Sequence, residues 1–426
     1  MFEELLDFDC SCGRHHHLTT RIFHIEAGAA ERLPEVLAEL GISRPLLVYD
    51  NNTYNAARDA VSAALPEADE LILEGDPVHP DEVQIAAVQE ASAGHDGLVA
   101  VGSGVICDLT RYAAFETDLP FVVFPTAASV DGFVSNSSAL SIRGGKVTVP
   151  AKAPDAVVCD LDIICAAPPH LAASGVGDML SKYIAVADWK IGELTAGEYY
   201  CGKIADLERE AVDLIVSKAD GIASRDPEAM TALVRGLLLS GLAMQLAGIT
   251  RPASSFEHHF SHYLETVPVG GEIDTEALHG TKVGVATVYA AKYYPVFAQA
   301  LGRIFREHLP NRFDLEKVKE LYVRFPRSTV DWVEKENVPT ASEQLDPVLL
   351  EKNFEAVLKE ADSIPSPEKL ADVLKTVGGP YDYAGLHMRP EEFREAMEIC
   401  CYIRNRYTLL RLMCDYDLFD FSTIGD

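Results

Sequence analysis

Three histidines and a glutamate lie close together in the stretch SSFEHHFSHYLE. Ser254, followed three residues later by Glu257, has the spacing of a capping box, which predicts that a helix begins there. His258 and His262 are then one helical turn apart on the same face, whereas His259 points about 100° away. Because imidazole binds metals, relays protons and also hydrogen-bonds on polar helix faces, this stretch alone leaves all three uses open.

A carboxylate and a further histidine accompany two other predicted helices. SGVGDMLSKYIAVADWK has Asp178 at the opening of a helix and Lys182 one turn later, and LHGTKVGVATVYAAKYY has His279 followed by a helix. Asp178 and two imidazoles could hold a divalent ion on three sides and leave room for a substrate oxygen. They could equally be hydrogen-bonded polar groups between helices, and their spacing does not decide between the two.

A second candidate metal site is the N-terminal stretch CSCGRHHH, with Cys10, Cys12 and the histidines 15–17. The two cysteines are closer than in a Cys-x-x-Cys zinc knuckle, and the sequence shows no obvious distant second half. We therefore expect an ordinary exposed N-terminal segment here.

A glycine-containing turn follows the apolar run VAVG. Gly102, Ser103 and Gly104 lead into a predicted helix, whose N-terminal amides and dipole suit a pyrophosphate. The third glycine of the dinucleotide fingerprint is replaced by Cys107, and the ribose-binding acid usually found about 20 residues downstream is missing. Asp50, at the end of an earlier strand, could instead bind a ribose 2′-hydroxyl and repel a 2′-phosphate. A plain strand-to-helix turn is the alternative.

A second polar cluster, in PTAASVDGFVSNSSAL, follows another predicted strand. Its polar residues include Thr126, Ser129, Asp131, Ser135 and Asn136. Ligands of open α/β folds bind at the carboxyl edge of the sheet, where these side chains would lie. Serine and asparagine also simply form turns, so both interpretations stand.

Alternating strands and helices must position these groups. Apolar runs predict a parallel sheet covered on both faces, and Gly144-Gly145 predicts a hairpin. From about residue 168 the apolar spacing is helical up to about residue 411. We therefore expect an α/β domain over residues 1–165 and an all-helical domain over residues 166–426, with the ligand cleft between them. The expected strands are residues 44–50, 70–76, 97–104, 120–126 and 155–161, and the expected helical windows are 80–92 and 105–115.

Composition narrows the class of protein. The chain has 426 residues, of which 48% are hydrophobic, and a formal net charge of −30, which argues against nucleic-acid and anionic-membrane partners. Nine scattered cysteines favour reduced thiols over a disulfide framework. The acidic N-terminus is not a secretory signal, and the longest apolar stretch, GLLLSGLAMQLAGI, is too short to span a bilayer. A cytoplasmic enzyme is expected.

Six stretches, in this order, resemble one family: VGSGVICDLTRY, PTAASVDGFVS, SGVGDMLSKYIAVADWK, RPASSFEHHFSHYLE, HGTKVGVATV and IRNRYTLLRL. They are similar to the sn-glycerol-1-phosphate dehydrogenases, and most similar to the bacterial AraM-type branch of this family. The family lies within the iron-containing alcohol dehydrogenases and glycerol dehydrogenases. The resemblance implies a dehydroquinate synthase-like fold, with a nucleotide-binding α/β domain followed by a helical metal-binding domain.

The resemblance also implies roles for individual residues. His262 would be catalytic, Asp131 would be catalytic and touch substrate, and His259 would be structural. Lys182 would either bind substrate or pair with Asp178. The metal ligands would be Asp178, His258 and His279, and the dinucleotide site would comprise Asp50, Gly102, Ser103, Gly104, Asp108, Thr126 and Ser129.

The activity that the resemblance implies is reduction of dihydroxyacetone phosphate to sn-glycerol 1-phosphate, for phospholipid biosynthesis. NAD(P)H would supply hydride, and one zinc, nickel or iron ion would polarise the ketone. Bound water or His262 would protonate the product oxygen. The alternatives are a glycerol dehydrogenase that acts on dihydroxyacetone, a lyase similar to dehydroquinate synthase, and a non-catalytic nucleotide-binding protein. A homodimer is expected from the family.

One departure from the family concerns the residues before His258. The family reads SGSEH where this chain has Ser255, Phe256 and Glu257, and the phenylalanine could reshape or block the pocket. The cations that would bind a substrate phosphate are not evident from the sequence, and the candidates are Arg251, Lys182 and Arg111.

Overall fold

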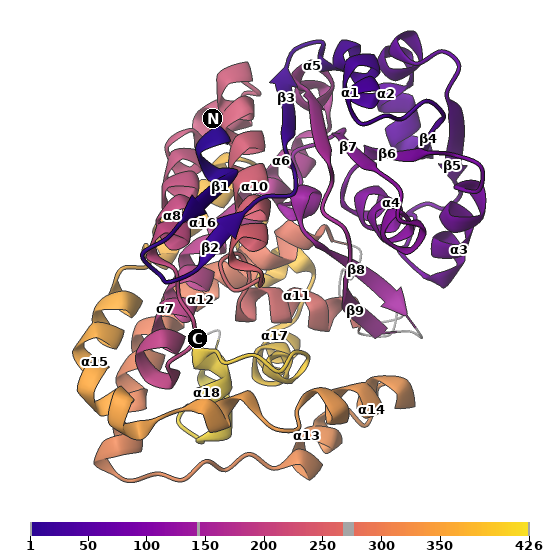
Figure 1. Cartoon of the computed structure of the whole chain (residues 1–426). Coiled ribbons are helices and arrows are strands. Elements are labelled where there is room, and N and C mark those ends of the chain that lie inside the picture. Colours follow the sequence, from indigo (N-terminus) through magenta and orange to yellow (C-terminus); the bar gives the residue numbers. More distant parts are fainter. Residues whose placement is uncertain (1, 143–144, 267–276, 425–426) are drawn as a thin grey trace.

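A six-stranded, wholly parallel sheet forms the core of the N-terminal part (Figure 1). The computed structural model describes residues 2–142, 145–266 and 277–424. The strand order is β3-β10-β7-β6-β4-β5. The strands are β3 (Ile22–Glu26), β4 (Pro45–Asp50), β5 (Asp69–Leu73), β6 (Gly97–Gly102), β7 (Phe121–Pro125) and β10 (Ala156–Asp160).

The central strands are apolar on both faces because helices cover both faces. On β4, Leu46 and Val48 pack into one hydrophobic core, and Leu47 and Tyr49 pack into another on the opposite face. Burial on both sides explains why these strands read as unbroken apolar runs rather than as alternating patterns. The covering helices are α1 (Leu33–Glu39), α2 (Asn51–Ala64), α3 (Glu82–Ala91), α4 (Gly104–Thr117) and α5 (Leu161–Ala166).

All regular elements within residues 161–266 and 277–424 are helical, which confirms the predicted fold class. The helices that build the site are α6 (Pro169–Leu180), α7 (Lys182–Ala196), α8 (Gly202–Ser217), α10 (Pro227–Ala247), α11 (Phe256–Thr266) and α12 (His279–Arg306). The others are α9 (Ala219–Ala223), α13 (Leu315–Leu321), α14 (Arg327–Glu336), α15 (Pro347–Asp362), α16 (Pro367–Thr376), α17 (Pro390–Ile399) and α18 (Leu409–Asp415).

Helix α10 is the one helix of the described chain that is long and apolar enough to cross a membrane by length and composition. It has 21 residues, more than its apolar stretch suggested, but 78% of its apolar window is buried inside the protein. Burial of this kind is typical of a core helix, and α10 packs between α8 and α6.

One predicted helix start is wrong, and a second helix starts near the predicted residue but without the predicted capping box. Asp178 lies in the last turn of α6, not at the opening of a helix, because α6 already begins at Pro169, and Lys182 begins α7. Helix α11 begins at Phe256, and the Glu257 carboxylate accepts from the Ser255 amide rather than closing a box with Ser254. Both changes alter how the polar groups are held but not which groups meet.

The N-terminal segment is also not the exposed stretch that was expected. Strands β1 (Asp7–Asp9) and β2 (His15–His17) form a small antiparallel hairpin that packs against α10 (Figure 1). His16 is buried, and its Nδ1 lies 2.6 Å from the carbonyl oxygen of Leu246. Strands of three residues are too short for a periodic signal in the sequence, and α10, the helix on which they pack, lies far away along the chain.

The predicted hairpin is present as β8 (Ser137–Ile142) and β9 (Gly145–Pro150), which pair in antiparallel register. Of the predicted turn residues, Gly144 lies outside the described residues. Edge strand β3 was missed by the sequence interpretation, although it pairs with β10 along its whole length.

Candidate active site

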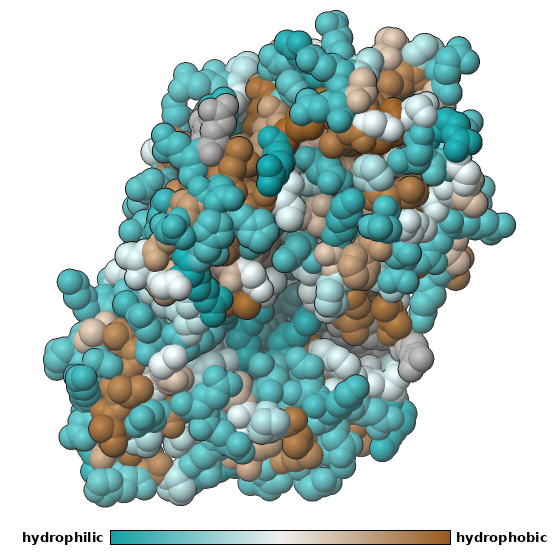
Figure 2. Space-filling model, viewed as in Figure 1, coloured by the Kyte–Doolittle hydropathy of each residue, from teal (hydrophilic) through white to brown (hydrophobic). Residues whose placement is uncertain are grey.

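A cleft of about 930 Å³ lies between the carboxyl edge of the sheet and the helical part. Figure 2 shows the molecule hollowed between its two halves, with mainly hydrophilic and neutral side chains around the hollow. The chain passes from β4 to its neighbour β5 on one side and then to β6 on the other, so β4 and β6 flank a topological switch point. Such a point is where open parallel sheets bind ligands.

The glycine turn opens onto this cleft. Gly102 ends β6, and Ser103 precedes the first turn of α4. The hydroxyls of Ser103 and Ser129 lie 2.6 Å apart, and the Thr126 amide donates to the Gly102 carbonyl over 3.2 Å. Two strand ends are therefore joined into one polar rim beneath the N-terminus of α4. The predicted residues Ser103, Gly104, Asp108, Thr126 and Ser129 all line the cleft.

Asp50 lies beside this turn because β4 and β6 are neighbours in the sheet. Its Oδ1 accepts the Thr53 amide at 2.8 Å, while the Thr53 hydroxyl accepts the Asp50 amide at 2.9 Å. The carboxylate therefore caps α2 and also borders the cleft. Asp50 thus lies on the strand next to the glycine turn and not about 20 residues after it. A carboxylate in this position is suited to bind a ribose hydroxyl.

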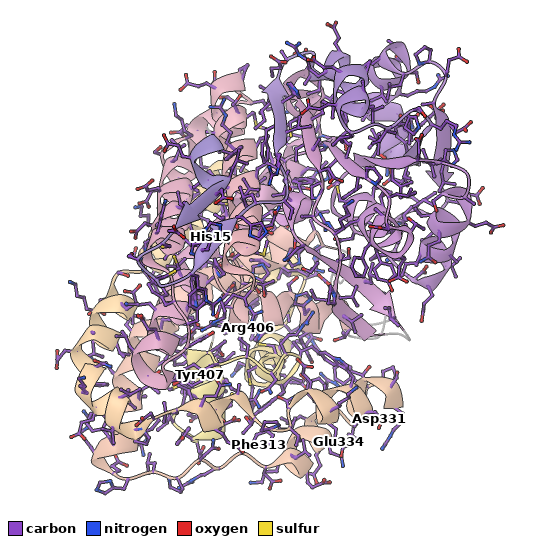
Figure 3. The ribbon with its side chains drawn as sticks, viewed as in Figure 1. His15, Phe313, Asp331, Glu334, Arg406 and Tyr407 are labelled. Atoms are coloured by element: carbon purple, nitrogen blue, oxygen red, sulfur yellow. The ribbon has the colours of Figure 1, made fainter. Side chains whose placement is uncertain are left out.

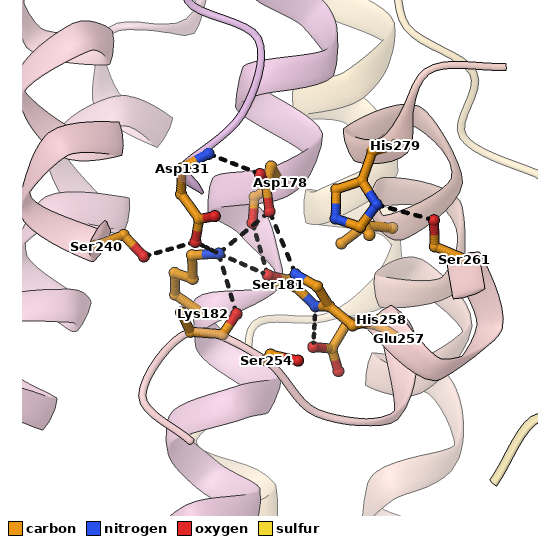
Figure 4. A network of polar contacts seen from close by, with 12 residues as sticks. Asp131, Asp178, Ser181, Lys182, Ser240, Ser254, Glu257, His258, Ser261 and His279 are labelled. Carbon is orange, nitrogen blue, oxygen red and sulfur yellow. Dashed lines mark hydrogen bonds and ion pairs between the residues drawn. The ribbon is translucent and has the colours of Figure 1, made fainter. Parts of the chain in front are cut away.

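Asp178, His258 and His279 converge at the other end of the cleft. One ligand atom from each residue lies within 4.8 Å of the other two. Asp178 is buried, and its Oδ1 lies 3.6 Å from His258 Nε2 (Figure 4). Two imidazoles and one carboxylate form a donor set that fits a divalent zinc, nickel or iron ion.

The outer nitrogens of both histidines are held by other groups. His258 Nδ1 lies 2.9 Å from Glu257 Oε1, and His279 Nδ1 lies 3.1 Å from the Ser261 hydroxyl and 3.3 Å from Glu265 Oε1. Such partners fix the tautomer and leave Nε2 of each ring for a metal. Asp178, His258 and His279 therefore fit a metal, because their ligand atoms already converge and because neighbouring groups already orient both imidazoles.

A buried ammonium lies behind this centre. Lys182 Nζ lies 2.7 Å from Asp131 Oδ2 and 3.2 Å from Asp178 Oδ1. Burial alone would raise the pKa of Asp178, but the Lys182 charge and the His258 hydrogen bond outweigh it and hold that pKa well below its usual range. Lys182 is fully buried, and its observed role is to form ion pairs with the two aspartates. Asp131, in contrast, lines the cleft.

His262 and His259 both border the cleft. Burial, followed by the charge of Arg404, lowers the pKa of His262 well below its usual value, and burial with Arg406 does the same for His259. Both rings are therefore neutral at pH 7. His259 borders the same cleft as His258 and His262, although it was predicted to point about 100° away from them on the helix.

Close contact between α6 and α12 brings Asp178 and His279 together. A Cβ added to Gly280 would lie 2.0 Å from the Ser174 carbonyl oxygen, and one added to Gly177 would lie 2.3 Å from the Gly280 carbonyl oxygen. Only glycine fits two backbones that lie this close together. These glycines therefore set the spacing between two of the three candidate ligands.

We expect Gly280→Ala to lower the free energy of unfolding by about 3 kcal/mol, because the methyl group meets backbone that cannot move aside easily. Denaturant unfolding of the purified protein measures this change. Gly202→Ala is the matched control, since a Cβ there meets nothing within 4 Å. Equal destabilisation by the two substitutions would contradict the close-packing account.

Arg404 and Arg406 are cleft residues that the sequence interpretation missed, although they lie in the motif IRNRYTLLRL. Figure 3 shows Arg406 near the centre of the molecule. Its guanidinium donates to Ser254 and Thr250, and Arg404 donates to Thr148 of β9. Burial, with Arg251 and Arg404, lowers the pKa of Arg406 to about 10. Among the residues that the structure describes, neither arginine forms an ion pair.

The three cations proposed from sequence are all engaged elsewhere. Arg251 forms an ion pair with Glu198 at 2.7 Å and lies outside the cleft lining. Arg111 binds Asp108 and three backbone carbonyls, and Lys182 binds the two aspartates described above. Arg404 and Arg406 are therefore better placed to receive an anion.

The departure at Phe256 does not change the pocket in the way expected. The Phe256 ring is fully buried and stacks on Tyr294, with ring centroids 5.6 Å apart, inside the helical core. It does not line the described cleft. Ser255 points to the Asp188 carboxylate instead, so the cleft next to His258 stays open.

Comparisons with known proteins agree with this architecture. A model of the iron-containing alcohol dehydrogenase family matches residues 24–168. A solved probable glycerol dehydrogenase from Sinorhizobium meliloti has a TM-score of 0.61 at 21% identity, covering 95% of this chain and 97% of its own. A sulfoacetaldehyde reductase from Bifidobacterium kashiwanohense, solved with NAD+, also has a TM-score of 0.61, at 16% identity, covering 94% and 97%. The fold is that of the iron-containing alcohol dehydrogenases.

A relative with higher identity defines the family. A protein of Bacillus licheniformis named glycerol-1-phosphate dehydrogenase, of the NAD(P)+ type, is 31% identical over 419 residues, covering 96% of this chain and 92% of the relative. The chain belongs to the glycerol-1-phosphate dehydrogenase family, as its motifs predicted.

Proposed function

We propose that this protein is a metal-dependent oxidoreductase that reduces dihydroxyacetone phosphate to sn-glycerol 1-phosphate with NAD(P)H. The observation that carries the proposal is the arrangement of one cleft. At one end it has a glycine turn and a helix N-terminus, and at the other Asp178, His258 and His279. Arg404 and Arg406, which form no ion pair with the described residues, also line it. A nucleotide, a metal and an anionic substrate would thus meet in one space.

Asp178, His258 and His279 would hold the metal. When bound, a divalent ion would polarise the ketone as a Lewis acid, and NAD(P)H would supply the hydride. Glu257 and Ser261 would orient the two imidazoles, and Lys182 would keep Asp178 ionised. Of the residues proposed as catalytic, Asp131 would contact a substrate hydroxyl at the cleft wall, and Lys182 would act through Asp131.

The substrate phosphate would bind Arg404 and Arg406. Guanidinium groups match phosphate oxygens in pairs, and neither of these two is neutralised by a described carboxylate in an ion pair. The ring of His259, on α11, also borders the cleft, and its nitrogens have no hydrogen-bond partner among the described residues, so it can donate to the anion. This arrangement favours the phosphorylated ketone over dihydroxyacetone.

His262 would serve the proton transfer. As a neutral imidazole it carries one N–H that it can donate to the product oxygen, while its second nitrogen takes a proton from water, which leaves the ring neutral again. Its Nδ1 forms no hydrogen bond with the described residues. A ring that stays neutral and has a nitrogen available is suited to relaying protons over a wide pH range.

Asp50, Gly102, Ser103, Gly104, Asp108, Thr126 and Ser129 would bind the dinucleotide. We expect Asp50→Ser to raise the ratio of kcat/KM for NADPH to that for NADH about tenfold or more, because a carboxylate close to a 2′-phosphate repels it. Serine is also a good N-cap, so α2 keeps its cap and the melting temperature should change little. Steady-state kinetics with both cofactors measure the ratio, and an unchanged ratio would count against this role.

Kinetics with different ketones test the proposed reaction. The proposal expects NADH oxidation with dihydroxyacetone phosphate at a kcat/KM well above that with dihydroxyacetone, and a product that sn-glycerol-3-phosphate dehydrogenase does not oxidise. A glycerol dehydrogenase would show no preference for the phosphorylated ketone. A lyase would give no net NADH consumption, and a non-catalytic protein would bind nucleotide without turnover.

Three broader proposals accompany the reaction. The division into an α/β domain of residues 1–165 and a helical domain of residues 166–426 would place the cleft at the domain interface. A homodimer and a cytoplasmic location would suit a metabolic enzyme of this family. Size-exclusion chromatography with light scattering measures the assembly directly.

A further inference from the structure

Four metal-ligating side chains meet outside the active site, where the N-terminal hairpin lies on the helical part. Cys10, Cys12, His16 and Cys201 each offer one ligand atom, and these atoms lie within 4.8 Å of one another. Cys201 directly precedes α8, so it supplies the distant second half that the sequence did not reveal. From this cluster we propose a structural zinc site of the Cys₃His type, separate from the catalytic centre.

The distances suit a tetrahedral ion. Zn–S bonds of about 2.3 Å and Zn–N bonds of about 2.0 Å place ligand atoms about 3.5–3.8 Å apart around a tetrahedron. The Cys10 and Cys201 sulfurs lie 3.6 Å apart, Cys12 Sγ lies 3.2 Å from His16 Nε2, and Cys201 Sγ lies 3.8 Å from the same nitrogen. Three thiols and one imidazole complete a closed coordination shell with no open position, as structural zinc sites require.

The surroundings of the cluster also favour a metal over a disulfide. His16 Nδ1 lies 2.6 Å from the Leu246 carbonyl, which can only accept, so Nδ1 carries the proton and Nε2 points its lone pair at the sulfurs. A disulfide between Cys10 and Cys201 would leave both Cys12 and His16 without a role. The Tyr199 hydroxyl lies 3.6 Å from Cys12 Sγ and can donate to a thiolate.

The neighbouring His15 does not belong to the site. His15 lies 3.0 Å from both Asp7 and Asp9 on the exposed side of the hairpin (Figure 3). The zinc would therefore join residues 10–16 to the start of α8, and His16 would tie both to the end of α10. From this hairpin the chain continues into the edge strand β3, so the metal would fasten the N-terminus across the helical part.

Metal content of a variant that lacks the catalytic ligands tests the proposal without relying on activity. We expect the full-length Asp178→Ala/His258→Ala/His279→Ala protein to retain about one equivalent of zinc. Its cobalt-substituted form should show the intense sulfur-to-cobalt charge-transfer absorption that a site without thiolates does not give. No retained zinc and no such absorption would overturn the site, and so would a Cys10–Cys201 disulfide in the purified protein.

Thiol modification provides a second measurement on the unaltered protein. Cys10 and Cys12 should resist alkylation while zinc is present and react once a chelator removes it, whereas the half-buried Cys165, outside the cluster, should react equally in both states. Cys12→Ser should lose the zinc that Cys165→Ser retains. Alkylation of Cys10 and Cys12 at the same rate with and without zinc would overturn the proposal.

Discussion

Replacing His279 with alanine is expected to lower kcat/KM for dihydroxyacetone phosphate by about 10³-fold or more. His279 would be one of three metal ligands, and the Lewis-acid effect of a metal is worth several kcal/mol, with each 1.36 kcal/mol equal to tenfold in rate. The loss of metal should be visible directly as a lower content of bound ion after dialysis. Steady-state kinetics and metal analysis of the same preparation measure both effects.

A graded variant and a control sharpen this test. Ser261→Ala removes only the hydroxyl next to His279 Nδ1 and should weaken metal binding by about 10–100-fold, because such outer partners orient the ligand. His24→Ala, on edge strand β3, should leave kinetics and metal content unchanged. A His279→Ala enzyme with normal turnover and a full metal complement would rule out the proposed centre.

Substituting both cleft arginines should change substrate preference. We expect Arg404→Ala/Arg406→Ala to lower kcat/KM for dihydroxyacetone phosphate by about 10³-fold, since each charge-assisted hydrogen bond contributes about 1.5–3 kcal/mol. Activity on dihydroxyacetone should stay within a few-fold of the parent, because that substrate has no phosphate. The ratio of the two kcat/KM values is therefore the diagnostic quantity.

Arg406 also holds Ser254 and Thr250, so the single Arg404→Ala variant should be measured beside the double variant. Arg404→Ala alone should lower the ratio by about 10- to 100-fold. Arg312→Ala, which removes an exposed arginine paired with Asp417, is the matched control. Equal loss of activity on both ketones would show that the arginines support the fold of the cleft rather than bind phosphate.

The α/β part could be predicted because its determinants are local. Runs such as PLLVYD and FVVFP are mainly apolar because helices cover both faces of the sheet. Turns such as Gly102 to Gly104 mark where a strand ends. The three-residue strands β1 and β2 were not predicted, since so short a segment has no detectable period. Asp178 was placed at the wrong end of its helix because the glycines of α6 resemble a loop, although they serve close packing with α12.

The candidate site was only partly predictable, because only some of its contacts are between residues that are close together in the sequence. The spacing of His258 and His262 is a property of one helix and can be read from sequence. Arg404 and Arg406 join the cleft only because the C-terminal segment folds back onto α11. Cys201 meets His16 across 185 residues, and no local pattern encodes that contact.

The most direct test of the central claim is NADH oxidation by chelator-treated protein given dihydroxyacetone phosphate, before and after zinc or nickel is added back. The account predicts no turnover in the treated protein, recovery on addition of metal, and no recovery in His279→Ala at the same metal concentration. Turnover that persists at full rate after complete removal of metal, or that metal restores equally in His279→Ala, would contradict a metal-dependent ketone reduction at Asp178, His258 and His279.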